Sequence, residues 1–486
     1  MNSTPLRPAS LFHYFYEISR IPRPSKKEEK IIAYLKAFGE KHKLETKVDK
    51  AGNVLINKPA TPGKAHLKTV ILQSHVDMVC EKNDGVNHNF LNDAIQIEID
   101  GEWMKAKGTT LGADNGIGVA TELALLASED IEHGPIECLF TVDEETGLTG
   151  AFALKEGFMS GDILLNLDSE DEGEMFTGCA GGMRTTGILK YKEEPVPNGY
   201  FFFRISVKGL KGGHSGCDIH LGRGNANKIV NRFLTQTATK HDMYLCEING
   251  GNQHNAIPRE AYAVCAVPDD DKHAIRTAFN LFTTEIENEL SAVEPDLKLI
   301  LESETARTSA IDKDTAIRLL KTIYALPHGV YAMSQDIPEL VETSTNLASV
   351  KMQEGNVIRI ETSQRSSILS ACKDIATAVR SVFELGGAEA RSNEGYPGWK
   401  PNPQSEILHI AMESYKRLFG TDAKVKAIHA GLECGLFLDK YPSLDMLSFG
   451  PTIREVHSPD EKILIPTIEK FWKHLIDILK NIPEKV

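Results

Sequence analysis

The first strong periodic pattern in the chain lies between residues 25 and 38. Ser25 and Glu28 have the spacing of a capping box, and they precede apolar residues at helical intervals, namely Ile31, Ile32, Leu35 and Phe38. Apolar side chains three and four positions apart occupy one face of a helix. The pattern therefore predicts that an amphipathic helix opens the fold.

Between residues 70 and 167 the pattern changes to short, mainly apolar runs. These runs alternate with a helical stretch at 116–127 and lie at 70–72, 136–142 and 163–167. Strands buried on both faces of a sheet have nearly continuous apolar sequences, and their alternation with helices favours parallel pairing. We therefore predict an α/β domain with a mainly parallel sheet.

From about residue 183 the pattern is typical of an α+β domain. Half-buried strands are predicted at 201–207, 262–267 and 357–362, and a helix at 274–290. After the breaker-rich stretch at 395–398, strand and helix alternate again up to a closing helix at 468–482.

This sequence of patterns predicts one domain inserted into another. Residues 1–182 and 391–486 would form the two parts of the α/β domain, and residues 183–390 the inserted α+β domain.

The composition excludes several classes of protein. The 486 residues are 41% hydrophobic, and 54 Lys plus Arg face 68 Asp plus Glu, for a formal charge of −14. This charge repels both nucleic acid and anionic membranes, so neither is an expected partner. The eight widely spaced cysteines are typical of reduced thiols. The chain shows no leader pattern after Met1–Pro5 and no long apolar run. Together with the reduced thiols, these features predict a cytoplasmic protein.

His75 and Asp77 follow directly on a predicted buried strand. A spacing of two places both side chains on one face of the chain. A carboxylate beside a metal-binding imidazole commonly orients the ring, although an isolated H-x-D pattern also arises by chance.

Asp114 lies in the glycine-rich segment 108–118, which leads into a predicted helix. An ordinary N-cap explains this aspartate as well as a binding role does. The glycines do not follow G-x-G-x-x-G, and an acid in the loop repels a pyrophosphate, which excludes a dinucleotide site.

Acidic residues end two further predicted strands. Glu144 and Glu145 follow the run at 136–142, and Asp168 follows the run at 163–167. The carboxyl ends of parallel strands line one crevice, so we expect these acids to lie near His75. His457, in the loop after a late strand, is a further candidate, although a surface histidine is the ordinary interpretation. Histidine with several carboxylates suits zinc, or manganese or cobalt, in a hydrolytic site.

Two other hydrolytic chemistries fit less well. The segment 212–216 is not a G-x-S-x-G elbow, and Cys434 lacks the signature of a thiol protease.

Taken together, these residues resemble the two-zinc exopeptidase family that includes carboxypeptidase G, the aminoacylases and the carnosinases. Further motifs resemble the branch that cleaves dipeptides ending in histidine, and they lie at 178–182, 209–216, 255–260 and 429–437. The resemblance extends from about residue 10 to 483.

The resemblance implies a role for each candidate. Asp114 would bridge two divalent ions, with zinc first and cobalt or manganese as alternatives, and the peptide after it would be cis. The remaining ligands would be His75 and Asp168 on one ion, and Glu145 and His457 on the other. Asp77 would orient His75, and Glu144 would act as the general base. Asp143, an unexpected third acid, would raise the pKa of Glu144.

The resemblance also implies functions for the inserted domain, as a lid that carries dimer contacts. His214 would polarise the scissile carbonyl, while Asn255 and Arg365 would hold the carboxylate end of the substrate. The expected activity is hydrolysis of small dipeptides, preferentially Xaa-His, β-alanyl-histidine among them, by a homodimer. The alternatives are an aminoacylase or carboxypeptidase of the same fold, and a catalytically silent peptide-binding protein.

Overall fold

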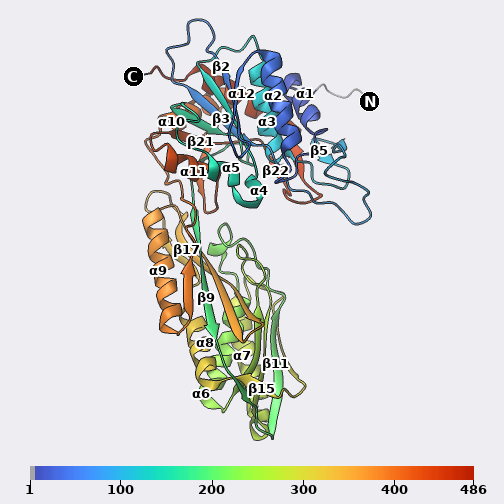
Figure 1. Ribbon diagram of the computed structural model, residues 1–486, viewed down its shortest axis with the longest axis vertical. Helices are drawn as coiled ribbons and strands as arrows, with labels where there is room; N and C mark the ends of the chain where they lie inside the picture. The colour runs from blue at the N-terminus through green and yellow to red at the C-terminus, as the bar shows by residue number, and fades with distance from the viewer. Residues whose placement is uncertain (1–5, 486) are drawn as a thin grey trace. The chain divides into compact units, whose positions relative to one another are not determined.

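The chain divides into two compact units in the computed structural model, which describes residues 6–485. Unit 1 comprises the chain up to Gly178 together with Pro401–Ala427 and the residues from Leu432 onward. Unit 2 comprises Cys179–Lys400 and Ile428–Gly431. In Figure 1, unit 1 therefore carries the blue and red ends of the colour scale, and unit 2 the middle.

The unit boundaries fall after Gly178 and after Lys400. The boundaries expected from the sequence were after residue 182 and after residue 390. Among residues 6–485, no helix is both long and apolar enough to cross a membrane. Met1–Pro5, which entered the expectation about a leader, lie outside the described residues.

Unit 1 is built on a mixed sheet in the order β1-β2-β6-β3-β7-β21-β8-β20. Its four central strands are parallel: β6 (Ile136–Thr141), β3 (Val70–His75), β7 (Ile163–Asn166) and β21 (Asp445–Ser448). Every residue of β3, β6 and β7 is buried, as expected of strands covered on both faces. The outer strands are β1 (Glu45–Val48), β2 (Val54–Lys58), β8 (Glu174–Cys179) and β20 (Lys424–Ile428).

Helices cover this sheet and share one apolar core with it. The longer helices are α1 (Ala9–Ile18), α2 (Glu29–His42), α3 (Ala113–Ala127), α10 (Glu406–Phe419) and α12 (Ile465–Lys480). The short ones are α4 (Glu144–Gly147), α5 (Thr149–Ala153) and α11 (Glu433–Lys440). Helix α1 packs on α3, which packs on β3, and α10 packs on α12.

Two expectations about the first helix were wrong. Helix α1 precedes α2, and its buried Leu11, Phe12, Phe15 and Ile18 show the same helical spacing. The capping box does not form, because Glu28 rather than Ser25 precedes α2 and no side chain caps the helix. The Ser25 hydroxyl instead donates to Asp77 Oδ2 at 2.7 Å.

A small antiparallel sheet of unit 1 holds two loops that matter for the site. Its order is β22 (Ile453–Arg454), β23 (Lys462–Leu464), β5 (Trp103–Ala106) and β4 (Ile97–Asp100). The loop between β22 and β23 carries His457, and the segment after β5 leads into α3 and Asp114.

Unit 2 is an antiparallel sheet with helices, as the α+β pattern predicted. The strand order is β14-β11-β13-β12-β17-β18-β9-β19, with β16 also paired to β17. The strands are β9 (Gly181–Lys190), β11 (Tyr200–Lys208), β12 (Tyr244–Gly250), β13 (Ala261–Pro268), β14 (Lys298–Ser303), β16 (Gly329–Met333), β17 (Val341–Gln353), β18 (Val357–Ser366) and β19 (Glu389–Ser392). The helices are α6 (Ala226–Lys240), α7 (Lys272–Leu290), α8 (Lys313–Ala325) and α9 (Leu369–Leu385), and β10 (Glu193–Pro195) pairs with β15 (Ser309–Ile311).

The short segment Ile428–Gly431 belongs to unit 2 although both of its neighbours belong to unit 1. The Ala180 N–H lies 3.1 Å from Ile428 O and 2.9 Å from Ala430 O. His429 Nε2 lies 2.7 Å from the Ser344 hydroxyl. These hydrogen bonds explain why the four residues join the second unit.

Candidate metal centre

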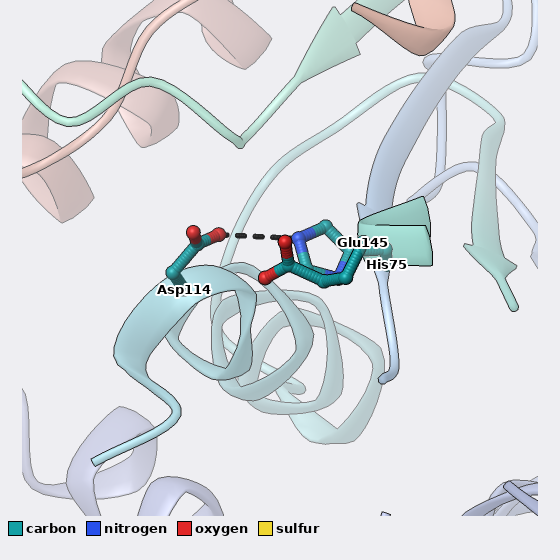
Figure 2. A group of neighbouring side chains, drawn as sticks. All are labelled: His75, Asp114 and Glu145. Atoms are coloured by element: carbon teal, nitrogen blue, oxygen red, sulfur yellow. Dashed lines mark hydrogen bonds and ion pairs between the residues drawn. The ribbon is translucent and has the colours of Figure 1, made fainter. Parts of the chain in front are cut away.

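His75 ends β3 and is buried, with acids on both sides of its ring. Its Nδ1 lies 3.3 Å from Asp77 Oδ1 and 3.2 Å from Asp77 O. Its Nε2 lies 3.1 Å from Asp114 Oδ1 (Figure 2). The same nitrogen lies 3.3 Å from Asp168 Oδ1. Although burial opposes it, these carboxylates raise the pKa of His75 well above its ordinary value. The ring orientation is thus fixed from the Nδ1 side, and Nε2 faces two acids.

Asp114 stands between two histidines. Its Oδ1 faces His75, and its Oδ2 lies 3.3 Å from His457 Nε2. Hydrogen bonds from His457 and His75 hold the pKa of Asp114 below its ordinary value, although burial opposes them. The Asp114–Asn115 peptide is cis, as the family resemblance implied. One carboxylate oxygen for each histidine is the arrangement a bridging ligand requires.

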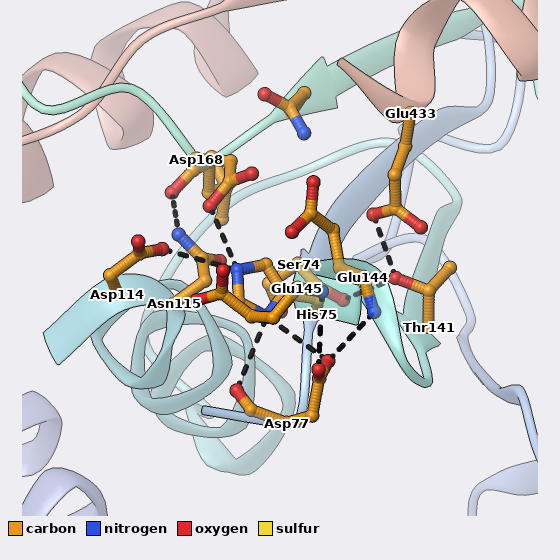
Figure 3. A network of polar contacts seen from close by, with 12 residues as sticks. Ser74, His75, Asp77, Asp114, Asn115, Thr141, Glu144, Glu145, Asp168 and Glu433 are labelled. Carbon is orange, nitrogen blue, oxygen red and sulfur yellow. Dashed lines mark hydrogen bonds and ion pairs between the residues drawn. The ribbon is translucent and has the colours of Figure 1, made fainter. Parts of the chain in front are cut away.

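Asp77 holds the turn that carries Glu144 and Glu145. Its carboxylate accepts the backbone N–H of Glu144 at 3.0 Å and that of Glu145 at 3.3 Å (Figure 3). Although burial opposes them, hydrogen bonds from His75, Ser25 and the Glu144 N–H lower the pKa of Asp77. Asp77 is therefore an anion that connects β3 to α4.

Glu145 and His457 form the second pair at the site. Glu145 Oε2 lies 3.0 Å from His457 Nε2. Hydrogen bonds that the His457 ring donates to Asp114 and Glu145 raise the pKa of His457 to about 11. His457 has a positive φ of 60°, a conformation that a histidine adopts at some cost and that surrounding structure must hold.

The donor set fits divalent cations. Ligand atoms of His75, Asp114 and Glu145 all lie within 4.8 Å of one another. Glu145 Oε1 is buried and accepts no hydrogen bond within residues 6–485, and the buried Asp168 Oδ1 faces only the His75 ring. Burial raises the pKa of Asp168 to about 6, and the charges of Asp114 and Glu145 add to this effect. Carboxylate oxygens beside two imidazoles are a nitrogen and oxygen ligand set of the kind that zinc accepts.

Glu144 differs from its neighbours because no ion pair fixes its carboxylate among the described residues (Figure 3). Burial raises the pKa of Glu144 well above its ordinary value; the charge of His75 opposes this, and the charges of Asp168 and Glu433 add to it. The causes that shift this pKa do not include Asp143, which was expected to raise it. The Asp143 carboxylate accepts hydrogen bonds from the Thr146 and Thr149 hydroxyls.

Three residues of unit 2 were predicted to bind substrate, and two of them, His214 and Arg365, lie side by side. Arg365, on β18, is 8% exposed, and its Nη2 lies 3.2 Å from His214 Nε2. Arg365 donates to the Tyr396 hydroxyl at 3.1 Å and to the Ser215 hydroxyl at 3.4 Å. These three groups are all neutral when His214 is neutral, so the buried guanidinium lacks a counterion among residues 6–485.

The hydrogen bonds of His214 define its tautomer. Backbone N–H groups of Gly216 and Cys217 donate to Nδ1 at 3.3 and 3.0 Å. Burial, with the charge of Arg365, lowers the pKa of His214 to about 4, so the ring is neutral near pH 7. A neutral ring that accepts at Nδ1 carries its proton on Nε2. His214 and Arg365 therefore both present donors to the same place, which favours an oxygen acceptor there.

Asn255, the third residue, is exposed. Its backbone oxygen accepts the Ser215 N–H at 2.8 Å, so it lies beside the His214 segment through its main chain. Its role in substrate binding, like those of His214 and Arg365, stays a prediction.

Glu433, which begins α11 and lies in the motif at 429–437, was not among the predicted site residues. Glu433 is 1% exposed, and its Oε2 accepts a hydrogen bond from the Thr141 hydroxyl at 2.8 Å (Figure 3). The same oxygen accepts one from Gln73 Nε2 at 2.7 Å. Burial raises the pKa of Glu433 to about 8. The pattern around it gave no reason to separate this acid from a helix-starting residue.

Comparisons with known sequences and structures show what this chain is similar to. The sequence profile of Peptidase family M20/M25/M40 matches residues 71–481. Cytosol non-specific dipeptidase of Escherichia coli (strain K12) is 45% identical over 483 residues, which is 99% of either chain. The structure of aminoacylhistidine dipeptidase from Vibrio alginolyticus has a TM-score of 0.92 and 45% identity, over 100% of this chain and 99% of that one. The structure of aminopeptidase PepT from Bacillus cereus shares the fold, with a TM-score of 0.61 and 17% identity. The match covers 98% of this chain and 99% of that one. The predicted fold class is confirmed.

Proposed function

The chain belongs to peptidase family M20/M25/M40, and we propose that it is a metal-dependent dipeptidase. The membership confirms the resemblance of its motifs. The relative from E. coli is named a non-specific dipeptidase, and the one from V. alginolyticus an aminoacylhistidine dipeptidase. With 45% identity to each over nearly the whole chain, dipeptides are the substrate class that the relationship supports best. Hydrolysis of Xaa-His, β-alanyl-histidine included, is the finer proposal.

The observation that carries the proposal is the position of Asp114 between His75 and His457. We assign His75 and Asp168 to one divalent ion, Glu145 and His457 to a second, and Asp114 to both. Zinc is the first candidate, and cobalt and manganese accept similar ligands. When bound, a pair of such ions polarises a peptide carbonyl and lowers the pKa of water toward about 7.

The protein's own residues then handle the protons. Asp77 keeps the His75 ring in one orientation through Nδ1, so that Nε2 remains available as a ligand. Glu144 accepts a proton from the attacking water and delivers it to the amine that leaves. Burial raises the pKa of Glu144, which favours the second step, in which the carboxyl group donates the proton.

Residues of unit 2 would hold the polar groups of the same substrate. The Nε2–H of His214 would donate to the oxygen of the scissile carbonyl, and Arg365 would bind the terminal carboxylate. The support for this part is the pair of converging donors and the absence of a counterion for Arg365 among residues 6–485. A carboxylate matches both features, because a guanidinium donates two parallel hydrogen bonds to it.

The proposal is tested by assaying the purified chain on a panel of free dipeptides. The panel contains β-alanyl-histidine, a Leu-His and a Leu-Leu dipeptide, each also as the C-terminal amide, together with an N-acetyl amino acid. We expect hydrolysis of the free dipeptides, its loss after removal of metal by a chelator, and its return with Zn²⁺, Co²⁺ or Mn²⁺. Preference for the N-acetyl amino acid would instead indicate an aminoacylase, and no hydrolysis by metal-loaded protein would indicate a binding protein.

We also propose a cytoplasmic location, supported by the name of the E. coli relative, a cytosol dipeptidase. The homodimer expected from the sequence stays a prediction. Sedimentation of the metal-loaded protein would test it directly.

A further inference from the structure

Glu461 is a buried acid whose carboxylate accepts its hydrogen bonds from backbone N–H groups. It lies in the loop between β22 and β23 and is 2% exposed. It accepts the N–H groups of four consecutive residues, at 2.7, 2.9, 2.7 and 3.2 Å from Leu111, Gly112, Ala113 and Asp114. Two of these donors bond Oε2 and two bond Oε1, so each oxygen has two partners.

Arg23 holds the carbonyl groups of the same region. It is 1% exposed, and its Nη2 donates to Gly112 O at 2.5 Å. Its Nη1 donates to Val76 O and to Asp77 O, both at 3.0 Å. One guanidinium therefore joins the segment after His75 to the segment before Asp114.

The chain leaves room for this guanidinium. A Cβ at Gly112 or at Gly116 would stand 2.6 Å from Arg23 Nη2, closer than real contacts allow. Gly112 also has a φ of 69°, a conformation that favours glycine. The two glycines are thus explained by Arg23, and the glycine-rich character of the loop needs no ligand phosphate.

The two charged residues connect the elements that carry the proposed ligands. Glu461 follows His457 by four residues in one loop, and it fixes the backbone N–H of Asp114. His457 and Asp114 in turn meet at 3.3 Å through their side chains. The same loop therefore supplies one ligand and anchors another.

We propose that Glu461 and Arg23 are positioning residues that hold Asp114 between the two histidines before an ion binds. This inference rests on the proposed metal-dependent function. Four N–H groups that donate to one carboxylate hold the backbone of residues 111–114 in one conformation. The Asp114 side chain is therefore already in position when an ion binds. Groups that orient ligands typically contribute about 10- to 100-fold to metal affinity.

The decisive substitution is Glu461→Gln, which keeps the size of the side chain. An amide has one oxygen and one NH₂ group, so two of the four N–H groups would face a donor in place of an acceptor. The matched control is Glu137→Gln. Glu137 is also a buried acid of unit 1, 6% exposed, and it accepts the N–H of Ser160 at 2.9 Å and that of Gly161 at 3.2 Å. It lies near the start of β6, at the opposite end of that strand from Glu144.

The experiment measures zinc affinity of the apo proteins by competition with a chromogenic chelator, together with the thermal midpoint with and without Zn²⁺. We expect Glu461→Gln to weaken zinc binding by about 10- to 100-fold and to reduce the stabilisation by zinc. We expect Glu137→Gln to lower the midpoint of the apo protein while zinc affinity stays within about twofold of wild type. Wild-type zinc affinity in Glu461→Gln, or equal losses in both variants, would overturn the inference.

Two further measurements keep the test decisive. If Glu461→Gln does not fold, Glu461→Asp replaces it, because it keeps the charge but withdraws both oxygens by one methylene. Aspartate should then give an intermediate loss of zinc affinity, and unchanged affinity would again overturn the inference. Wild-type protein that binds no zinc, cobalt or manganese would contradict the proposed function itself, an outcome distinct from wild-type binding that is insensitive to Glu461.

Discussion

Replacing Arg365 by methionine should separate substrate recognition from stability. Methionine preserves much of the apolar stem and removes the charge. Arg365 is 8% exposed, and its protein partners are the neutral hydroxyls of Tyr396 and Ser215 and the ring of His214. Removing a buried charge that lacks an ion-pair partner relieves a desolvation cost, so the free energy of unfolding should be unchanged or higher.

The effect on catalysis has the opposite sign. A hydrogen bond to a charged group contributes about 1.5–3 kcal/mol. Loss of one such bond to the substrate carboxylate lowers kcat/KM by about 10- to 150-fold. Wild-type enzyme should cleave the C-terminal amide of the same dipeptide with a kcat/KM that is lower by a similar factor. In Arg365→Met the amide should lower kcat/KM little further, because both changes remove the same interaction.

The assay compares the free dipeptide and its amide on wild type and on two variants. The control is Arg359→Met, on the same strand, because Arg359 is about 41% exposed and pairs with Glu361 at 2.6 Å. It should keep wild-type kcat/KM. The reasoning is refuted if Arg365→Met cleaves the free dipeptide within about twofold of wild type, or if the amide suffers a full second loss in that variant.

Four further outcomes are expected. Glu144→Gln should keep its metal but lower kcat by about 10² to 10⁴, and normal turnover would remove Glu144 as the base. Glu145→Gln should lower metal content, measured by elemental analysis, whereas equal metal loss in the Glu144 variant would contradict the separate roles. His214→Ala should lower kcat per metal-loaded enzyme by about 10² to 10³, and a change within twofold would exclude it from the mechanism. Burial lowers the pKa of His474 from 6.5 to about 4, so the unfolded state binds more protons between these values. Stability should therefore fall by up to about 1.4 kcal/mol per pH unit from pH 6.5 to 4, and His474→Gln should flatten this slope in urea titrations.

The sequence predicted the sheet of unit 1 well because its strands are buried on both faces. Runs such as Val70–Leu72 lie within strands of the structure, and parallel strands meet at one edge. The position of the strand ends was therefore enough to bring His75, Asp168 and the Glu144 turn together.

Other features were not predictable because their partners lie far along the chain. Ser25 has capping-box spacing, yet its hydroxyl donates to Asp77, 52 positions away. Glu461 bonds backbone groups about 350 positions away, and its neighbours Asp460 and Lys462 make it look like part of a solvated charge run. A carboxylate that accepts from the main chain leaves no pattern of residue types, so only the folded structure reveals it.

Every role proposed for these residues depends on two divalent ions, one on either side of Asp114. Anomalous diffraction at the zinc absorption edge, from crystals of the zinc-loaded protein, would locate the ions. We expect two peaks in each chain, one in contact with His75 and Asp168, the other with Glu145 and His457, and both in contact with Asp114. A single peak, or peaks away from Asp114 in a folded and active enzyme, would contradict this arrangement.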